Sequence, residues 1–138
     1  MNHNLTINIP THERHQLLRR AINYYECFNY QIIIVDSSKK NLQYNFRHNF
    51  SYFHFPNEKF CLKIYKIIYA IKTDFVSICP DDDFLISEFL EKTILKMSSN
   101  KNISSLRGTS VKFKYQDQKL YFNNFKPIQQ KYNKNNFG

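Results

Sequence analysis

Glycine is almost absent from this chain of 138 residues, which contains only Gly108 and Gly138. Walker A loops and the GxGxxG fingerprint of dinucleotide-binding proteins both need several glycines, because the backbone can approach a phosphate closely only where side chains are missing. Both motifs are therefore excluded. If a nucleotide binds to this chain, side chains and a metal ion must hold its phosphates.

Cysteine pairs and long apolar runs are also missing. Cys27, Cys61 and Cys79 are widely spaced and form no CxxC pair, which argues against a disulfide framework or a zinc site and favours a reducing cytosol. No apolar run is long enough to span a bilayer, and the N-terminus shows no secretory signal. We expect a cytoplasmic location, with peripheral contact at the inner face of the membrane left open.

The net charge of +9 could suit nucleic acid, a phosphorylated substrate or an anionic membrane surface. Only Arg19–Arg20 and Lys39–Lys40 are adjacent basic pairs, and there is no basic block. We therefore do not expect nucleic acid as the partner. A nucleic-acid-binding domain stays the less favoured alternative, and its affinity would fall steeply with salt without depending on Mn²⁺.

The apolar pattern predicts one α/β domain over residues 1–115, with a polar, weakly ordered tail at 116–138. Strands are expected at 5–9, 31–35, 51–55, 73–79 and 111–115, with a further short strand considered at 103–106. Helices are expected after residues 11, 57 and 87. Alternating strands and helices imply a mostly parallel sheet with helices on both faces. The segment 73–79 is expected to be the buried central strand.

Polar residues are expected to cap the N-termini of the helices, and each helix is expected to pack on the sheet through an apolar stripe. Thr11, Asn57 and Ser87 are the expected N-caps, with Glu13 in the first turn of the first helix. In the second helix, lysines at 63, 66 and 72 lie off the expected buried stripe, which comprises Phe60, Ile64, Ile67, Ile68 and Ile71.

Three consecutive carboxylates, Asp81 to Asp83, follow the strand that Pro80 ends. Adjacent like charges repel and are costly to bury unpaired, so the triplet suggests a divalent cation held by oxygen ligands. A solvated turn is the alternative, since aspartate is common in turns. The polar segments 11–14 and 36–38 end two other strands, and ligands bind beyond the carboxyl ends of parallel strands. We expect the three sets to converge at one edge.

Three segments in this order resemble the nucleotide-sugar-binding half of family 2-like glycosyltransferases of the GT-A fold. They are Leu-Thr-Ile-Asn-Ile-Pro-Thr-His-Glu-Arg at 5–14, Ile-Ile-Ile-Val-Asp-Ser-Ser at 32–38 and Cys-Pro-Asp-Asp-Asp-Phe-Leu at 79–85. The resemblance covers roughly residues 5–115. It implies a GT-A-like, Rossmann-like sheet that is incomplete at the C-terminus.

The resemblance implies transfer of a sugar, with inversion, from a nucleoside diphosphate sugar to a hydroxyl of an unknown glycan or lipid-linked acceptor. The triplet would be the DXD-type motif, with Asp81 and Asp83 binding Mn²⁺ or Mg²⁺ and Asp81 and Asp82 contacting the nucleotide sugar. Hard oxygen ligands suit these ions. A bound metal would neutralise charge on the departing diphosphate.

The same resemblance places further residues along the donor, for which a UDP-sugar is the first choice. Pro10, Thr11 and Glu13 would line the nucleotide, and Asp36 would accept a hydrogen bond from the base. Lys63 matches a position near the nucleotide or its phosphates; a solvated helix lysine is the alternative. Ordinary surface positions are expected for His12 and His15.

The sequence departs from the family in its second half, which usually supplies acceptor contacts and the carboxylate base. Asp117 is the only acidic residue after Glu91, and it matches no such motif. The catalytic residues are therefore unassigned. A truncated, inactive donor-binding fragment is the alternative to an active transferase. His12 also replaces the Tyr or Phe of the usual Pro-Thr-Tyr-Asn pattern.

Overall fold

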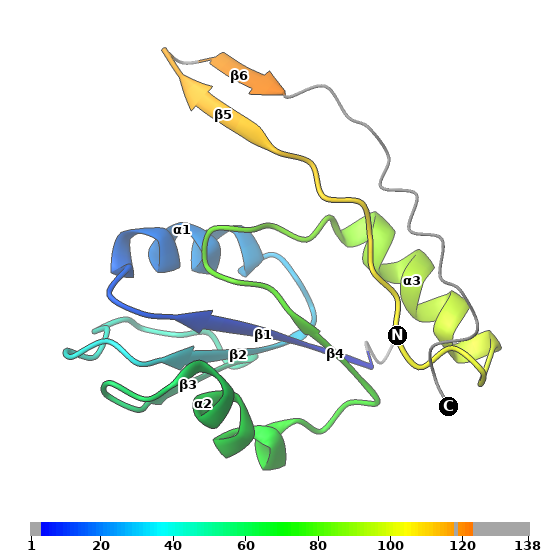
Figure 1. Cartoon of the computed structure of the whole chain (residues 1–138), viewed down its shortest axis with the longest axis horizontal. Helices are drawn as coiled ribbons and strands as arrows, with labels where there is room; N and C mark the ends of the chain where they lie inside the picture. The colour runs from blue at the N-terminus through cyan, green and yellow to red at the C-terminus, as the bar shows by residue number, and fades with distance from the viewer. Residues whose placement is uncertain (1–3, 118, 123–138) are drawn as a thin grey trace. The chain divides into compact units, whose positions relative to one another are not determined.

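The computed structural model describes residues 4–117 and 119–122 and divides the chain into two compact units, Met1–Lys101 and Asn102–Gly138. The first unit is an α/β structure around a four-stranded, all-parallel sheet in the order β3-β2-β1-β4 (Figure 1). Its elements are β1 (Leu5–Thr11), α1 (His15–Tyr25), β2 (Gln31–Asp36), β3 (Phe50–His54), α2 (Phe60–Lys66), the 3₁₀ helix η1 (Ile68–Ala70), β4 (Phe75–Ile78) and α3 (Ser87–Ser99).

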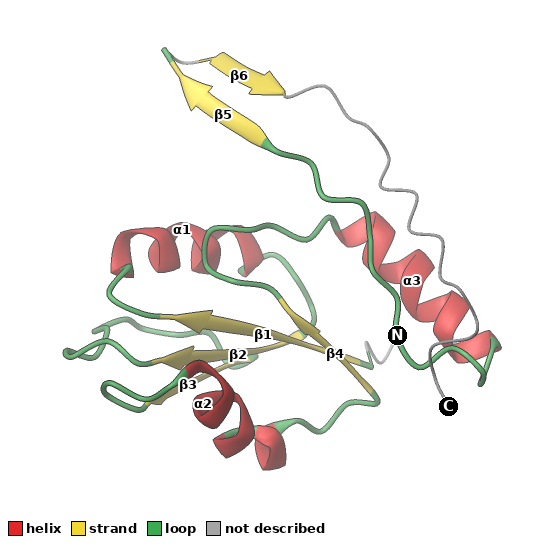
Figure 2. Ribbon diagram, in the orientation of Figure 1, coloured by secondary structure: helices red, strands yellow, loops and turns green. Residues whose placement is uncertain are grey.

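Helices cover both faces of this sheet, as the sequence predicts (Figure 2). On one face, alternate residues of β1 and β2 pack against α1, and α3 adds half-buried Leu90 and Ile94. The helical spacing of the sequence predicts a buried face of Leu17, Leu18, Ala21, Ile22 and Tyr25 for α1. All of these are buried except Leu17, which is half-buried. Each fully buried isoleucine, leucine or phenylalanine side chain contributes about 1.5–3 kcal/mol of transfer free energy.

The other face carries a smaller core, in which Ile33, Val35 and Ile67 are buried. The predicted apolar stripe is confirmed only in part: Ile67 is buried and Ile71 packs against this core, but Phe60 and Ile68 are each 52% exposed. The helix turns Lys63 inward instead. Lys63 is 3% exposed and is the only buried residue of α2.

The sequence predicts that Pro10 ends the first strand, and this is wrong. Pro10 lies within β1 and pairs with Val35. The carbonyl of Asn8 accepts the Cys79 N–H at 2.9 Å, so the even-numbered residues of β1 face β4. The pairing with β4 ends at Asn8. At position 10 a backbone N–H would therefore point toward β4, where the pairing between the two strands has already ended. The N–H that proline lacks thus costs no hydrogen bond between strands.

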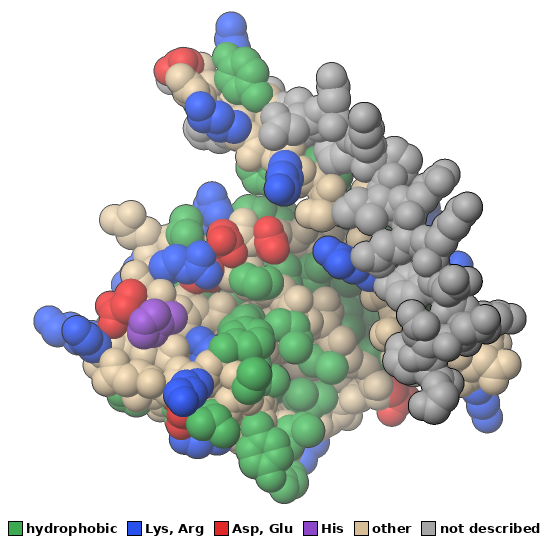
Figure 3. Space-filling model, in the orientation of Figure 1, with side chains coloured by type: hydrophobic (Ala, Val, Ile, Leu, Met, Phe, Trp, Pro, Cys, Tyr) green, Lys and Arg blue, Asp and Glu red, His purple; other side chains and the backbone are tan. Residues whose placement is uncertain are grey.

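The strand before the aspartate triplet is not the central strand that the sequence predicts. Among the described residues, β4 pairs only with β1 and lies at the edge of the sheet. Val76 and Ile78 are both 49% exposed, so only one face of β4 is covered. Figure 3 shows apolar side chains gathered on the face that carries α2 in Figure 1. No helix in the described part of the chain is both long and apolar enough to cross a bilayer.

The predicted helix starts are also corrected. Thr11 lies in β1, and Glu13 precedes α1 with a φ of 53°. Asn57 has a φ of 58°, a left-handed conformation that cannot continue into a helix. Glu88 does lie in the first turn of α3. The N-caps are the residues directly before each helix, and none of their side chains bonds to the backbone of its helix as a cap: Arg14, Lys59 and Ile86.

In the described part of the second unit, β5 (Phe113–Gln116) and β6 (Lys119–Phe122) form an antiparallel hairpin. The strand predicted at 111–115 is thus present but pairs with β6 rather than joining the parallel sheet. Residues 103–106, considered as a strand, form none. Of the predicted tail, 119–122 is a strand, whereas 118 and 123–138 lie outside the described residues.

Candidate functional site

The carboxyl ends of β1, β2 and β4 meet at one edge of the sheet, and their polar residues form a bonded cluster. Thr11, the last residue of β1, donates its Oγ1 hydrogen to Oδ2 of Asp81 at 2.5 Å. The N–H of Ser37, directly after β2, donates to the carbonyl of Thr11 at 3.1 Å. The structure therefore brings the 11–14, 36–38 and 81–83 segments together in the first unit.

Asp36 is fully buried at the end of β2, and three internal donors bind its carboxylate. Its Oδ1 accepts the Ser38 N–H at 2.7 Å, and its Oδ2 accepts the Tyr52 hydroxyl at 2.7 Å and His15 Nε2–H at 2.9 Å. Burial alone would raise the pKa of Asp36, but these hydrogen bonds outweigh it and hold the pKa below its ordinary value.

Lys63, in α2, connects the ends of β1 and β2. Its Nζ donates to the carbonyl of Thr11 at 2.6 Å and to the Ser37 hydroxyl at 3.1 Å. Burial lowers the pKa of Lys63, and the charges of Asp36 and Asp81 oppose that shift. A buried cation is costly unless it is paired, so Lys63 balances the two buried carboxylates. The alternative of a solvated helix lysine is wrong.

Asp81 is also fully buried, and Arg14 is its charged partner. The Arg14 guanidinium lies 2.5 Å from Asp81 Oδ1 and 2.9 Å from Asp82 Oδ2, so it spans two members of the triplet. The contact with Asp81 is an ion pair without hydrogen-bond alignment, because Oδ1 makes no hydrogen bond. Burial raises the pKa of Asp81, and the bond from Thr11 and the charge of Arg14 only partly oppose it.

The triplet fits a divalent cation only in part. The buried Oδ1 of Asp81, without a hydrogen bond, is a hard ligand of the kind that Mg²⁺ and Mn²⁺ prefer. Asp82 and Asp83, however, are exposed. Within residues 4–117 and 119–122, no three His, Cys, Asp or Glu side chains are arranged to hold a metal ion. The positive charge beside Asp81 and Asp82 is that of Arg14.

The remaining predicted residues lie around this cluster. Pro10 is buried within β1. Glu13 is exposed, and its Oε1 accepts the Lys39 N–H at 2.7 Å while its own N–H donates to the Ser38 hydroxyl at 2.7 Å. Glu13 thus ties the segment after β1 to the loop after β2.

Sequence reasoning missed how far histidines support this edge. Besides the bond from His15 to Asp36, His12 Nδ1 donates to the Ser37 carbonyl at 3.0 Å, and His54 Nε2 donates to the Ser38 carbonyl at 2.7 Å. His12 is exposed, as expected, and His15 is half-buried, but the sequence did not predict their bonds to Ser37 and Asp36. The only sign of these contacts in the sequence was that the histidines lie close to the ends of predicted strands.

Asp36 and Asp81 predict opposite dependences of stability on pH. Asp36, whose pKa is lowered on folding, contributes stability above its unfolded pKa that is lost as the pH falls through its folded pKa. Asp81, whose pKa is raised, costs stability as the pH rises through its folded value. We expect Asp36→Asn to flatten the decline of stability below about pH 4, and Asp81→Asn to flatten a decline above it. Urea unfolding across this range measures both, and curves parallel to the wild type would contradict the assignment.

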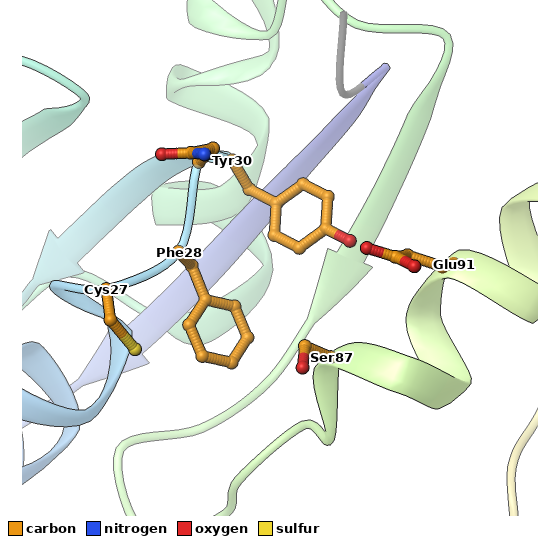
Figure 4. A pocket seen from close by; sticks show the side chains of 6 residues that line it. Cys27, Phe28, Tyr30, Ser87 and Glu91 are labelled. Atoms are coloured by element: carbon orange, nitrogen blue, oxygen red, sulfur yellow. The ribbon is translucent and has the colours of Figure 1, made fainter. Parts of the chain in front are cut away.

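A pocket in the described part of the chain lies elsewhere. It has a volume of about 290 Å³ and is lined by Phe28, Tyr30, Ser87 and Glu91, among others. Figure 4 shows the Tyr30 side chain pointing toward Glu91. None of the residues of the strand-end cluster lines it. We place the candidate site at the strand ends, because the buried charges converge there.

No family model, curated protein or solved structure matches this chain.

Proposed function

We propose that the chain binds a nucleoside diphosphate sugar, most simply a UDP-sugar, at the carboxyl edge of β1, β2 and β4, with Mn²⁺ or Mg²⁺. We further propose that this binding serves glycosyl transfer to a hydroxyl of a glycan or lipid-linked acceptor. The fold would be GT-A-like, and the acidic triplet would be its DXD-type motif. The proposal rests on the resemblance in sequence and on the geometry of the strand ends.

One observation carries the proposal: two fully buried carboxylates, Asp36 at the end of β2 and Asp81 just after β4, meet at the carboxyl ends of the strands, and the charge of Lys63 interacts with both. Buried charges cost stability, and a chain that needed only a turn at these positions would have no use for them. Perturbed titratable groups that gather at the carboxyl edge of a parallel sheet are typical of a binding site.

Asp36 is suited to recognise a base. A carboxylate offers about four acceptor positions. Oδ1 of Asp36 accepts the Ser38 N–H, whereas Tyr52 and His15 share Oδ2. The second acceptor position of Oδ1 would take the N–H of a pyrimidine such as uracil. Because Asp36 is fully buried, the loop after β2 would have to move to admit the base.

The diphosphate would lie toward the triplet. A bound divalent metal would supply charge neutralisation there, with Asp81 and Asp83 as its ligands. Thr11 would keep Asp81 in place through its hydroxyl, and Asp82 would contact the nucleotide sugar. Lys63 would support the site from within the fold by holding the ends of β1 and β2 together.

Donor binding without transfer is the second candidate, and one observation favours it. Asp117 is the only acidic residue after Glu91, and it lies in the hairpin of the second unit with a φ of 50°. We therefore assign no described carboxylate outside the strand-end cluster as the base that would deprotonate the acceptor hydroxyl. Hydrolysis or transfer of a UDP-sugar by the purified chain would favour the enzyme over the binding protein.

Thermal unfolding in the presence of nucleotides tests the proposal. A ligand that binds only the folded state stabilises it by about 2.7 kcal/mol at a hundred times its Kd. We expect UDP and UDP-sugars with Mn²⁺ to raise the Tm, and Mn²⁺ or UDP alone to raise it little. If no uridine, guanosine or other nucleoside diphosphate raised the Tm of the folded chain with Mn²⁺, the proposal would be wrong.

A further inference from the structure

We propose that Arg14 occupies the cation position of the acidic triplet and that a divalent metal ion binds there only by displacing it. The inference rests on the metal site of the proposed function. It concerns what the chain's own residues do before and after that exchange.

The contacts of Arg14 carry the inference. Its two terminal nitrogens reach different carboxylates, NH2 to Asp81 Oδ1 at 2.5 Å and NH1 to Asp82 Oδ2 at 2.9 Å. Three successive carboxylates repel one another, and the guanidinium neutralises part of that charge. Because Asp81 is 0% exposed, it cannot rely on solvent for compensation. Lys63 supplies part of that compensation through its charge, and Arg14 is the cation in direct contact with Asp81.

The same contacts show why Arg14 can leave. Its side chain is 42% exposed, and the bond toward Asp81 lacks hydrogen-bond alignment. The backbone is fixed separately, because the carbonyl of Arg14 accepts the Leu18 N–H at 3.0 Å as the N-cap of α1. The guanidinium can thus move into solvent without disturbing the helix, whereas Asp81 Oδ1 stays buried and ready for a harder cation.

A released Arg14 would remain at the mouth of the site. The planar guanidinium matches phosphate oxygens with paired hydrogen bonds. We infer that Arg14 then turns to the diphosphate that arrives with the metal. Arg14 is in this sense a positioning residue, which exchanges a carboxylate partner for a phosphate partner.

Binding of Mn²⁺ alone, followed by the electron paramagnetic resonance signal of the free ion, tests the exchange without any nucleotide. We expect Arg14→Gln to bind Mn²⁺ about tenfold more tightly than the wild type, because the competing cation is gone. Arg14→Lys, which keeps the charge but not the fork, should lie between them. Arg19→Gln is the matched control, since Arg19 donates to the Gln43 carbonyl and stacks on Tyr44 away from the triplet.

Adding Asp81→Asn to Arg14→Gln should abolish the gain, which assigns the metal to this carboxylate. The proposal is overturned if Arg14→Gln and Arg14→Lys, both folded by circular dichroism, bind Mn²⁺ no more tightly than the wild type. A nucleotide titration separates this result from the proposed function. Tighter Mn²⁺ binding without any nucleotide binding would support the exchange and contradict the donor site, and the reverse pattern would do the opposite.

Discussion

Replacing Lys63 by methionine is expected to lower the free energy of unfolding by about 3 kcal/mol. Methionine keeps the apolar stem but removes the ammonium group. The carbonyl of Thr11 and the hydroxyl of Ser37 then lose a buried donor, and the charges of Asp36 and Asp81 lose a cation between them. Breaking a buried charge network leaves uncompensated charge in a low dielectric, which is why the expected loss is large.

Urea denaturation of the purified chain measures this loss. The matched control is Lys66→Met on the same helix, because Lys66 is 46% exposed and its contacts with Glu58 and the Phe55 ring lie at the surface. Surface ion pairs contribute about 0–1 kcal/mol, so this variant should stay near the wild type. Equal stability of the two variants would mean that Lys63 does not hold the strand ends together.

The second large effect concerns ligand binding. We expect Asp83→Ala and Asp81→Asn each to reduce Mn²⁺-dependent nucleotide binding by at least about 100-fold, since each removes a proposed metal ligand. Asp83 is exposed, so its loss should leave the fold intact. Asparagine at position 81 keeps the size of the side chain and one acceptor for the Thr11 hydroxyl.

Titration with a fluorescent uridine diphosphate analogue measures both variants. Asp74→Ala is the control, because Asp74 precedes β4 at the opposite edge of the sheet and bonds to Asn4. Unchanged affinity for the nucleotide in both Asp81→Asn and Asp83→Ala would show that these residues are not the metal ligands. A loss in the control as large as in the variants would indicate general damage to the fold rather than loss of ligands.

The sequence was sufficient for those parts of the fold that local pattern determines. Alternation at Leu5, Ile7 and Ile9 and the β-branched run at 31–35 predicted β1 and β2, because side-chain burial in strands follows a period of two or a continuous run. The spacing along α1 predicted its buried face for the same kind of reason.

The place of a strand within the sheet could not be predicted in this way. The apolar run before Pro80 suggested a central strand, yet β4 lies at the edge with Val76 and Ile78 half exposed. An apolar run reports what a segment tolerates, not which neighbours it has. The position of Pro10 inside β1 depends likewise on where the pairing with β4 ends, which is a property of two strands together.

The groups that bind the buried carboxylates could not be predicted from the sequence for a related reason. The spacing of α2 placed Lys63 off the apolar stripe, but its burial depends on Thr11 and Ser37, which belong to other segments. Tyr52 was part of a predicted strand without any hint that its hydroxyl binds Asp36. Hydrogen-bond partners far apart in the chain leave no periodic signal, so the sequence predicted the acidic residues and not the groups that compensate them.

The central claim is that the carboxyl edge of β1, β2 and β4 binds a nucleoside diphosphate through a divalent metal. Calorimetric titration of the wild-type chain with UDP, with and without Mn²⁺, tests it most directly. We expect binding in the micromolar to millimolar range that requires Mn²⁺. No binding of UDP, GDP or other nucleotides in either condition, by a chain shown to be folded, would contradict it.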